Sequence, residues 1–250
     1  MDFEKLACAH VRALTPYQSA RRIGGHGHTF LNANEYYKSE LYFFNSTTLN
    51  RYPDCQPFEL LALASEYVGM RPENILFSRG SDEAIGLIIR TFCEYGEGIV
   101  IAPPTYGMYA IAAQTNRAKV AVAKRENDFT LKADAVVEAV NSADFKVKAV
   151  FIDSPANPLG PVFAKEEFEK LVQALPEVLI VMDEAYIEFA PEHSFVKYIK
   201  DYPNVVVLHT LSKAFALAGI RCGYTIARPE TFSLCSRSSI LTRCPIPSIR

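Results

Sequence analysis

The sequence predicts an α/β fold of three layers, with a mostly parallel sheet between two layers of helices. Short apolar runs alternate with segments of helical periodicity from about residue 57 onward. The runs GIVIA, VLIVMD and NVVVLHT are apolar on both faces, which is typical of strands buried between helices. A chain of 250 residues with 49% hydrophobic side chains is long enough to bury such a core.

The helices are predicted from periodicity and from their ends. The segment from Ser81 opens with a capping residue and two acids and runs toward Gly96, which favours a helix over 81–95. The first residues, FEKLACAHVRAL, favour a short helix, whereas the stretch to His28 reads as an extended loop. The other predicted helices are 58–69, 132–143 and 165–175.

The strands are predicted from apolar runs that end at turn residues. Pro103-Pro104 ends one run, and Ser154-Pro155 ends another. The predicted strands are 74–78, 98–102, 119–123, 148–153, 178–183, 204–210 and 223–227. Strands of this kind, separated by helices, pair in parallel.

Composition excludes several classes of protein. The formal net charge is −2 and the basic residues are spread along the chain, so neither a nucleic-acid nor a membrane partner is expected. No apolar run reaches the roughly 18 residues that span a bilayer. Six irregularly spaced cysteines indicate free thiols in a cytoplasmic protein, and the five histidines form no metal-binding pattern.

Polar side chains gather directly after the predicted strands, where open α/β sheets bind their ligands. Asp183 ends an apolar strand, and a carboxylate there needs a cationic partner. Lys213 follows the next strand, and Arg221 comes eight residues later. The helix start at Ser81-Asp82 offers free backbone N–H groups to an anion. A lysine, an acid and an anion site together are what pyridoxal phosphate requires.

Each of these residues also has a plainer explanation when it is taken alone. A lysine after a strand is usually solvated, and an aspartate there is often a helix cap. Tyr106 alone would most often be a core residue, and Asn157 before a proline a turn residue. Their joint occurrence therefore carries the interpretation.

Eight runs of the chain, in order, resemble aminotransferases of the aspartate-aminotransferase fold, and most closely the histidinol-phosphate aminotransferase family. They are LTPYQSARR, LNANEY, TLNRYPDCQP, SRGSDEAI, PPTYGMY, SPANPLG, MDEAYIEF and TLSKAFALAGIRCGY, and they span residues 14 to about 227. The resemblance implies an N-terminal arm (1–30), a pyridoxal-phosphate-binding large domain (31–227) and a tail (228–250).

The resemblance also implies a role for each matching residue. Lys213 would be the catalytic lysine that forms the Schiff base and then moves the substrate proton, and Asp183 would pair with the pyridinium nitrogen. Tyr186 and Asn157 would contact the ring oxygen, and Tyr106 the ring face. The phosphate would be bound by Ser81, Asp82, Ser212 and Arg221. Tyr52 would contact the phosphate in the other subunit of a homodimer, and Tyr17 and Asn34 would contact the substrate.

The implied reaction converts histidinol phosphate and 2-oxoglutarate to imidazole-acetol phosphate and glutamate, a step of histidine biosynthesis.

The chain departs from the family at Ala156 and Leu159, where a second Asn and a Thr are usual. It also stops at Arg250, so the small C-terminal domain is expected to be largely missing. Two alternatives stay open: a decarboxylase of a phosphorylated amino acid that uses the same cofactor, and a non-catalytic fragment that retains the cofactor site.

Overall fold

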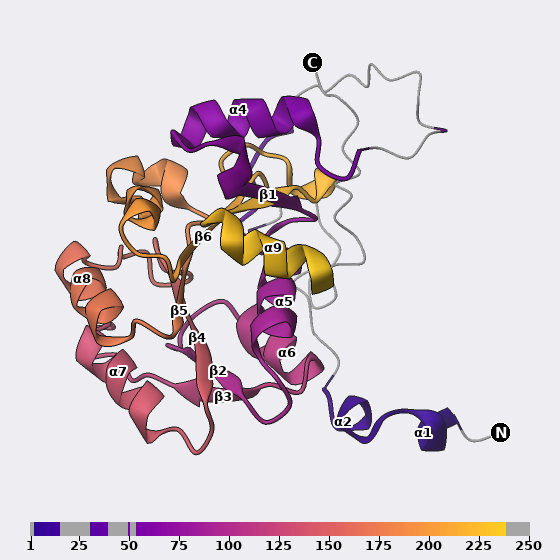
Figure 1. Cartoon of the computed structure of the whole chain (residues 1–250), viewed down its shortest axis with the longest axis vertical. Helices are drawn as coiled ribbons and strands as arrows, with labels where there is room; N and C mark the ends of the chain where they lie inside the picture. Colours follow the sequence, from indigo (N-terminus) through magenta and orange to yellow (C-terminus); the bar gives the residue numbers. More distant parts are fainter. Residues whose placement is uncertain (1–2, 16–30, 40–49, 51–53, 239–250) are drawn as a thin grey trace.

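One seven-stranded sheet forms the centre of the computed structural model, which describes residues 3–15, 31–39, 50 and 54–238 (Figure 1). The strands lie in the order β1-β7-β6-β5-β4-β2-β3. Their bounds are β1 Ile75–Ser78, β2 Gly98–Ile101, β3 Lys119–Val122, β4 Val147–Asp153, β5 Leu179–Asp183, β6 Val205–Thr210 and β7 Gly223–Ile226.

Most neighbouring strands are parallel, which confirms the predicted fold class. Strands β3, β2, β4, β5 and β6 form a continuous parallel block. Strand β7 runs antiparallel to both β6 and β1. The connection between β6 and β7, which the structure describes throughout, contains no α-helix that would cross the sheet, so β7 returns antiparallel beside β6.

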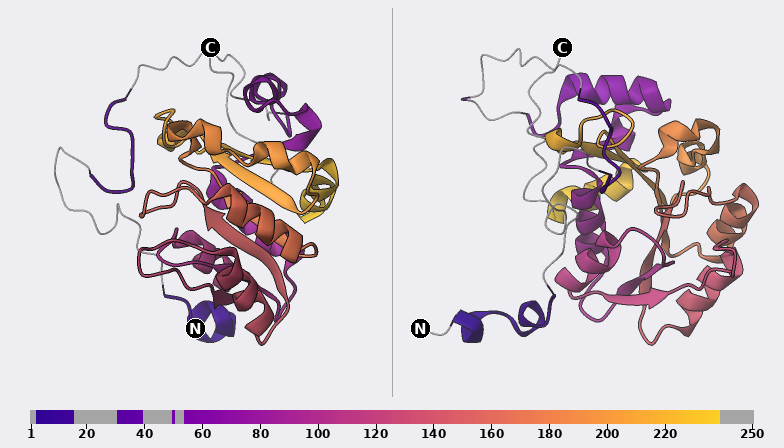
Figure 2. Two further views of the ribbon diagram at one scale, coloured as in Figure 1. Left: turned by 90° about the vertical axis from the view of Figure 1, so that its left-hand side faces the viewer. Right: turned by 180° about the vertical axis from the view of Figure 1, so that it is seen from behind.

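Helices cover both faces of the sheet, as Figures 1 and 2 show. Helices α5 (Ser81–Phe92), α6 (Met108–Thr115) and α9 (Pro229–Ser238) pack on one face. Helices α7 (Ala133–Ser142) and α8 (Lys165–Ala174), with the short turns between 187 and 200, cover the other. Helix α4 (Phe58–Val68) lies at the β1 edge. Each face therefore has its own apolar core, as the predicted three layers require.

The first helical segment is broken where a single helix was predicted. Helices α1 (Phe3–Leu6) and α2 (Ala9–Arg12) replace one helix over 3–14. Helix α2 lies near α6, where the Arg117 side chain donates a hydrogen bond of 3.0 Å to His10. Figure 1 shows both short helices extending away from the sheet. Too few apolar contacts hold them to favour one continuous helix.

Two helices were missed in the sequence. Helix α6 has only eight residues and is apolar on all sides, so it shows no periodicity. Helix α9 lies within the stretch from 228 that looks weakly patterned. It starts at a proline, which suits the first turn of a helix, and its Phe232 and Cys235 are buried beside α5.

A buried polar network joins the ends of β5 and β6 on the α8 face of the sheet. The Glu184 carboxylate and the His209 Nε2 atom lie 2.8 Å apart, and the His209 Nδ1 atom lies 3.0 Å from the Tyr224 hydroxyl. Ser194 donates a second hydrogen bond of 2.8 Å to Glu184. Glu184, His209 and Tyr224 are almost fully buried, and the network supplies their polar atoms with partners inside the core.

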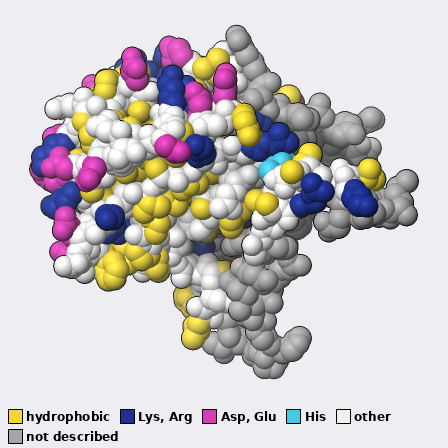
Figure 3. Space-filling view, turned by 90° about the horizontal axis from the view of Figure 1, so that it is seen from below, with side chains coloured by type: hydrophobic (Ala, Val, Ile, Leu, Met, Phe, Trp, Pro, Cys, Tyr) yellow, Lys and Arg dark blue, Asp and Glu magenta, His cyan; other side chains and the backbone are white. Residues whose placement is uncertain are grey.

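The surface charges and the cysteines of the described residues can now be located. On the described part of the face in Figure 3, acidic and basic side chains mix at the left and top, whereas basic side chains gather at the right. No helix of the described residues is long and apolar enough to cross a membrane. None of the five cysteines within those residues forms a disulfide, and Cys244 lies outside them.

Candidate active site

A cavity of about 400 Å³ lies at the carboxyl ends of β4, β5 and β6, beside the N-terminus of α5. Nine of the predicted site residues line it, and these are Ser81, Asp82, Tyr106, Asn157, Asp183, Tyr186, Ser212, Lys213 and Arg221. A tenth, Asn34, hydrogen-bonds to one of them. The remaining two, Tyr17 and Tyr52, lie outside the described residues. Groups that are up to 140 positions apart in the sequence thus share one cavity.

Two carboxylates stand side by side on the floor of the cavity. Parallel pairing of β4 with β5 places Asp153 opposite Asp183 at the last position of each strand. Both residues are buried and both line the cavity. Two neighbouring buried carboxylates repel one another, so each needs compensation.

Asp153 has its own cation. The buried Arg125 side chain lies 3.5 Å from its Oδ1 atom and also donates a hydrogen bond to the Ala102 carbonyl. The backbone N–H of Asn157 donates to the other carboxylate oxygen at 2.8 Å. Asp153 is therefore neutralised inside the protein and also holds the turn that carries Asn157.

Asp183 has only neutral partners among the described residues. The Tyr109 hydroxyl donates to its Oδ2 atom at 2.6 Å, and the backbone N–H of Ala185 donates to Oδ1 at 3.2 Å. Burial raises the pKa of Asp183 to about 7, and the nearby Asp153 charge adds to this, while both hydrogen bonds oppose it. A cation bound in the cavity would complete the compensation.

Lys213 reaches the same cavity from the loop after β6. Its amine donates a hydrogen bond of 2.7 Å to the Ala33 carbonyl and lies 5.6 Å from the centre of the Tyr186 ring. Partial burial lowers the pKa of Lys213, with Arg221 adding to the effect and the carboxylates of Asp82 and Glu35 opposing it. A lowered pKa leaves more of the amine neutral, which is the nucleophilic form.

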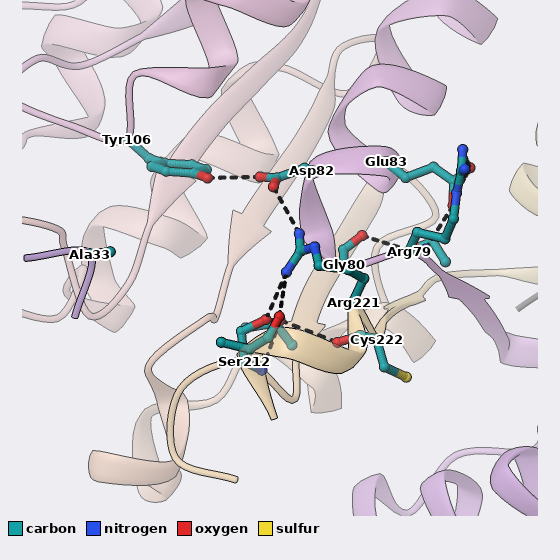
Figure 4. Close-up of polar contacts among 12 residues, drawn as sticks. Ala33, Arg79, Gly80, Asp82, Glu83, Tyr106, Ser212, Arg221 and Cys222 are labelled. Atoms are coloured by element: carbon teal, nitrogen blue, oxygen red, sulfur yellow. Dashed lines mark hydrogen bonds and ion pairs between the residues drawn. The ribbon is translucent and has the colours of Figure 1, made fainter. Parts of the chain in front are cut away.

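The opposite end of the cavity has the groups that a bound anion would need. The N-terminus of α5 has no side-chain cap, so its first backbone N–H groups have no capping acceptor. The Arg221 guanidinium lies 3.1 Å from Asp82 and 3.4 Å from Ser212 (Figure 4). Arg221 has a left-handed backbone (φ 56°), a strained conformation that often marks functional sites. A phosphate would meet the helix dipole and Arg221 together.

Tyr106 is tied to this end of the cavity. Its hydroxyl donates a hydrogen bond of 2.8 Å to Asp82, which also pairs with Arg221 (Figure 4). One carboxylate therefore connects the predicted ring platform to the predicted phosphate anchor. Asp82 itself is an acid, so it is suited to orient Arg221 and Tyr106 rather than to contact an anion.

Gly80 permits the close approach of α5 and Arg221. It has a positive φ of 77°, and a Cβ atom there would lie 2.7 Å from the Arg221 Nη2 atom. We expect Gly80→Ala to weaken the binding of inorganic phosphate to the unloaded chain by about tenfold, because the methyl group would displace the guanidinium. Calorimetric titration with phosphate measures this effect.

Gly69→Ala is the matched control for this prediction. Gly69 has a similar φ of 67° but no atom within 4 Å of an added Cβ. Both variants carry the backbone strain, and only the change at Gly80 perturbs Arg221. Equal phosphate affinity in the two variants would contradict the placement of the anion site.

The third side of the cavity carries the groups predicted to contact the ring oxygen and the substrate. The Asn34 side-chain amide donates to the Tyr186 hydroxyl at 3.0 Å, and its Nδ2 atom lies 3.5 Å from the side-chain Oδ1 atom of Asn157. Segment 31–39 thus reaches the mouth of the cavity. Burial raises the pKa of Tyr186, so its hydroxyl stays protonated.

Two residues that line the cavity were not predicted from the sequence. Asp153 ends an apolar strand in the same way as Asp183, so the same argument would have found it. Tyr109 carried no signal, because nothing in the run YGMY distinguishes the second tyrosine from a core residue. Among the described residues, no three acids, histidines or cysteines cluster as a metal site.

The donor set fits pyridoxal phosphate. The Lys213 amine suits an aldehyde, the uncompensated Asp183 suits a protonated ring nitrogen, and the α5 N-terminus with Arg221 suits a phosphate. Tyr106 and Tyr186 line the space between these groups. The roles of the individual residues stay predictions.

The model of the family "aminotransferase class I and II" matches residues 27–241. This chain belongs to that family.

Two curated relatives are histidinol-phosphate aminotransferases. The protein of Pectobacterium atrosepticum is 47% identical over 235 residues, which cover 93% of this chain and 65% of the relative. The protein of Aeromonas hydrophila is 47% identical over 253 residues, which cover 99% of this chain and 68% of the relative. This chain thus spans about two thirds of the length of these relatives.

A solved structure has the same fold. Histidinol-phosphate aminotransferase from Sinorhizobium meliloti, in complex with pyridoxal-5'-phosphate, matches with a TM-score of 0.78 and 24% identity, covering 94% of this chain and 66% of that chain. This match supports the predicted three-layer α/β architecture.

Proposed function

We propose that the chain is a pyridoxal-phosphate-dependent aminotransferase. The observation that carries this proposal is the juxtaposition in one cavity of Lys213, with a lowered pKa, and Asp183, a buried carboxylate without a cationic partner among the described residues. When bound, pyridoxal phosphate links to a lysine amine and draws electrons from the substrate α-carbon into its ring.

The residues of the chain supply binding, orientation and proton positions. Asp183 would hold a proton at the ring nitrogen, because a buried carboxylate favours an adjacent cation. Lys213, once free of the cofactor, would carry the proton of the substrate α-carbon. Arg221, Ser212 and the start of α5 would bind the phosphate, and Asn157 and Tyr186 would hydrogen-bond the ring oxygen.

We propose histidinol phosphate and 2-oxoglutarate as the substrates, with imidazole-acetol phosphate and glutamate as the products. The names of the relatives at 47% identity support this choice. The hydrogen bond of Asn34 to Tyr186, which lines the cavity, supports Asn34 as a proposed substrate contact. The proposal extends to a cytoplasmic homodimer in which Tyr52 reaches the phosphate in the other subunit, and to Tyr17 as a second substrate contact.

The test is to purify the 250-residue chain, add pyridoxal phosphate, and measure both the absorbance of lysine-bound cofactor and amino transfer from glutamate. Cofactor absorbance with transfer to imidazole-acetol phosphate supports the proposal. Release of CO2 from a phosphorylated amino acid would instead indicate a decarboxylase. Cofactor absorbance without turnover would indicate a cofactor-binding fragment, and no cofactor uptake would refute the assignment.

A further inference from the structure

Tyr109 is a buried tyrosine on α6 that lines the cavity of the candidate site beside Asp183. Its ring is completely buried, and its hydroxyl donates the 2.6 Å hydrogen bond to Asp183. Every buried tyrosine hydroxyl needs a partner, so a hydrogen bond alone indicates no more than a satisfied core residue. What distinguishes Tyr109 is the partner, a cavity-lining carboxylate that forms no ion pair among the described residues.

Aromatic neighbours fix the Tyr109 ring in place. Phe151 of β4 stacks on it with ring centroids 5.2 Å apart, and Tyr106 meets it edge-on at 5.7 Å. These two ring contacts restrict the Tyr109 ring and so help to hold its hydroxyl beside Asp183. Tyr109 links the residue predicted to lie on the cofactor face to the residue predicted to hold its ring nitrogen.

Tyr109 can act only as a donor toward Asp183. Burial and the adjacent carboxylate raise the pKa of Tyr109 well above its usual value, so the phenol stays protonated. Its hydrogen bond lowers the pKa of Asp183, against burial and against the charges of Asp153 and Asp82. The charge of Asp183 in turn opposes the lowering of the Lys213 pKa.

We propose that Tyr109 is a positioning residue that acts through Asp183, orienting its carboxylate and keeping its negative charge available to a protonated ring nitrogen. The inference rests on the proposed function for its purpose. Its structural part, control of the Asp183 carboxylate by Tyr109, can be measured without any cofactor. The link between Tyr109 and Asp183 and the proposed function of the chain can therefore be refuted independently of one another.

The first measurement follows Asp183 in the unloaded chain by carbon NMR of labelled aspartate carboxyls. Tyr109→Phe keeps the ring and removes the donor, so the titration midpoint of Asp183 is expected to rise by about one pH unit. Replacing Tyr109 with 3-fluorotyrosine keeps the hydroxyl and strengthens it as a donor. That variant is expected to lower the titration midpoint of Asp183. It provides the test if the phenylalanine variant fails to fold.

The second measurement follows the absorbance of lysine-bound pyridoxal phosphate against pH. In Tyr109→Phe the ring proton moves toward the more basic Asp183, so the lysine-bound group becomes more basic and its transition is expected at higher pH. Wild-type chain that takes up no cofactor would refute the proposed function and leave the carboxyl titration as the test of the Tyr109–Asp183 link.

Tyr224→Phe is the matched control. It deletes a buried hydroxyl on the other face of the sheet, where the partner is His209. Both phenylalanine variants lose a buried hydrogen bond, so both are expected to lose stability. Only the change at Tyr109 is expected to move the Asp183 midpoint and the cofactor transition. An unchanged Asp183 midpoint in both Tyr109 variants, or a cofactor transition identical to wild type, would overturn the inference.

Discussion

Lys213→Ala is expected to abolish the absorbance of lysine-bound pyridoxal phosphate, together with any amino transfer by the chain. The amine is the nucleophile for the aldehyde, and no described lysine other than Lys213 lines the cavity. Transfer should fall by at least about 10²-fold, the usual contribution of one positioned proton carrier. Absorbance spectra and glutamate-dependent turnover measure both effects.

Two variants separate the amine from other effects of the substitution. Lys213→Arg keeps a cation in the cavity but removes the nucleophile, so it should bind the cofactor without a covalent link. Lys165→Ala removes a surface lysine that pairs with Glu169, and it should behave like the wild type. Lysine-bound absorbance that persists in Lys213→Ala would show that another lysine forms the link.

Asp183→Asn is expected to stabilise the unloaded chain at neutral pH while weakening the binding of pyridoxal phosphate by about 10²-fold. The pKa of Asp183 is about 7 in the folded chain, against an ordinary value of 3.8. Its neutral form therefore stabilises the fold below about pH 4, and this contribution is lost as the pH rises to about 7. The loss is roughly 4 kcal/mol by linkage, and asparagine does not titrate.

Urea unfolding at pH 4 to 8 gives the free energy of unfolding for both proteins. The difference between Asp183→Asn and wild type should grow in favour of the variant as the pH rises. Asp201→Asn, an exposed aspartate, should show no such trend. A constant difference over this range would mean that Asp183 ionises in the folded chain as an ordinary carboxylate does.

Most of the sheet could be predicted because its strands are buried on both faces. A run such as VLIVMD leaves no polar face for a helix or a loop, and β5 begins and ends within a residue of the expected bounds. Short elements escaped prediction because tertiary contacts hold them. Helix α6 is stable because Tyr109 and Ala113 are buried against the sheet, and nothing local in MYAIAAQT specifies it.

Site residues could be predicted from the sequence where a residue of that type would cost free energy at its position unless it had a function there. Asp183 at the end of an apolar strand and Lys213 after the next one are of this kind, and the structure brings them into one cavity. Residues that act through others were not predictable in this way. Tyr109 contacts Asp183 and Arg125 contacts Asp153 over long separations in the sequence, and only the fold brings these pairs together.

The central claim is that Lys213 is the residue that carries the cofactor. Borohydride reduction of the chain with stoichiometric pyridoxal phosphate, followed by peptide mass spectrometry, tests it most directly. The prediction is one reduced adduct per chain, located on the peptide that contains Lys213. Adducts spread over exposed lysines, or none at Lys213, would contradict the account.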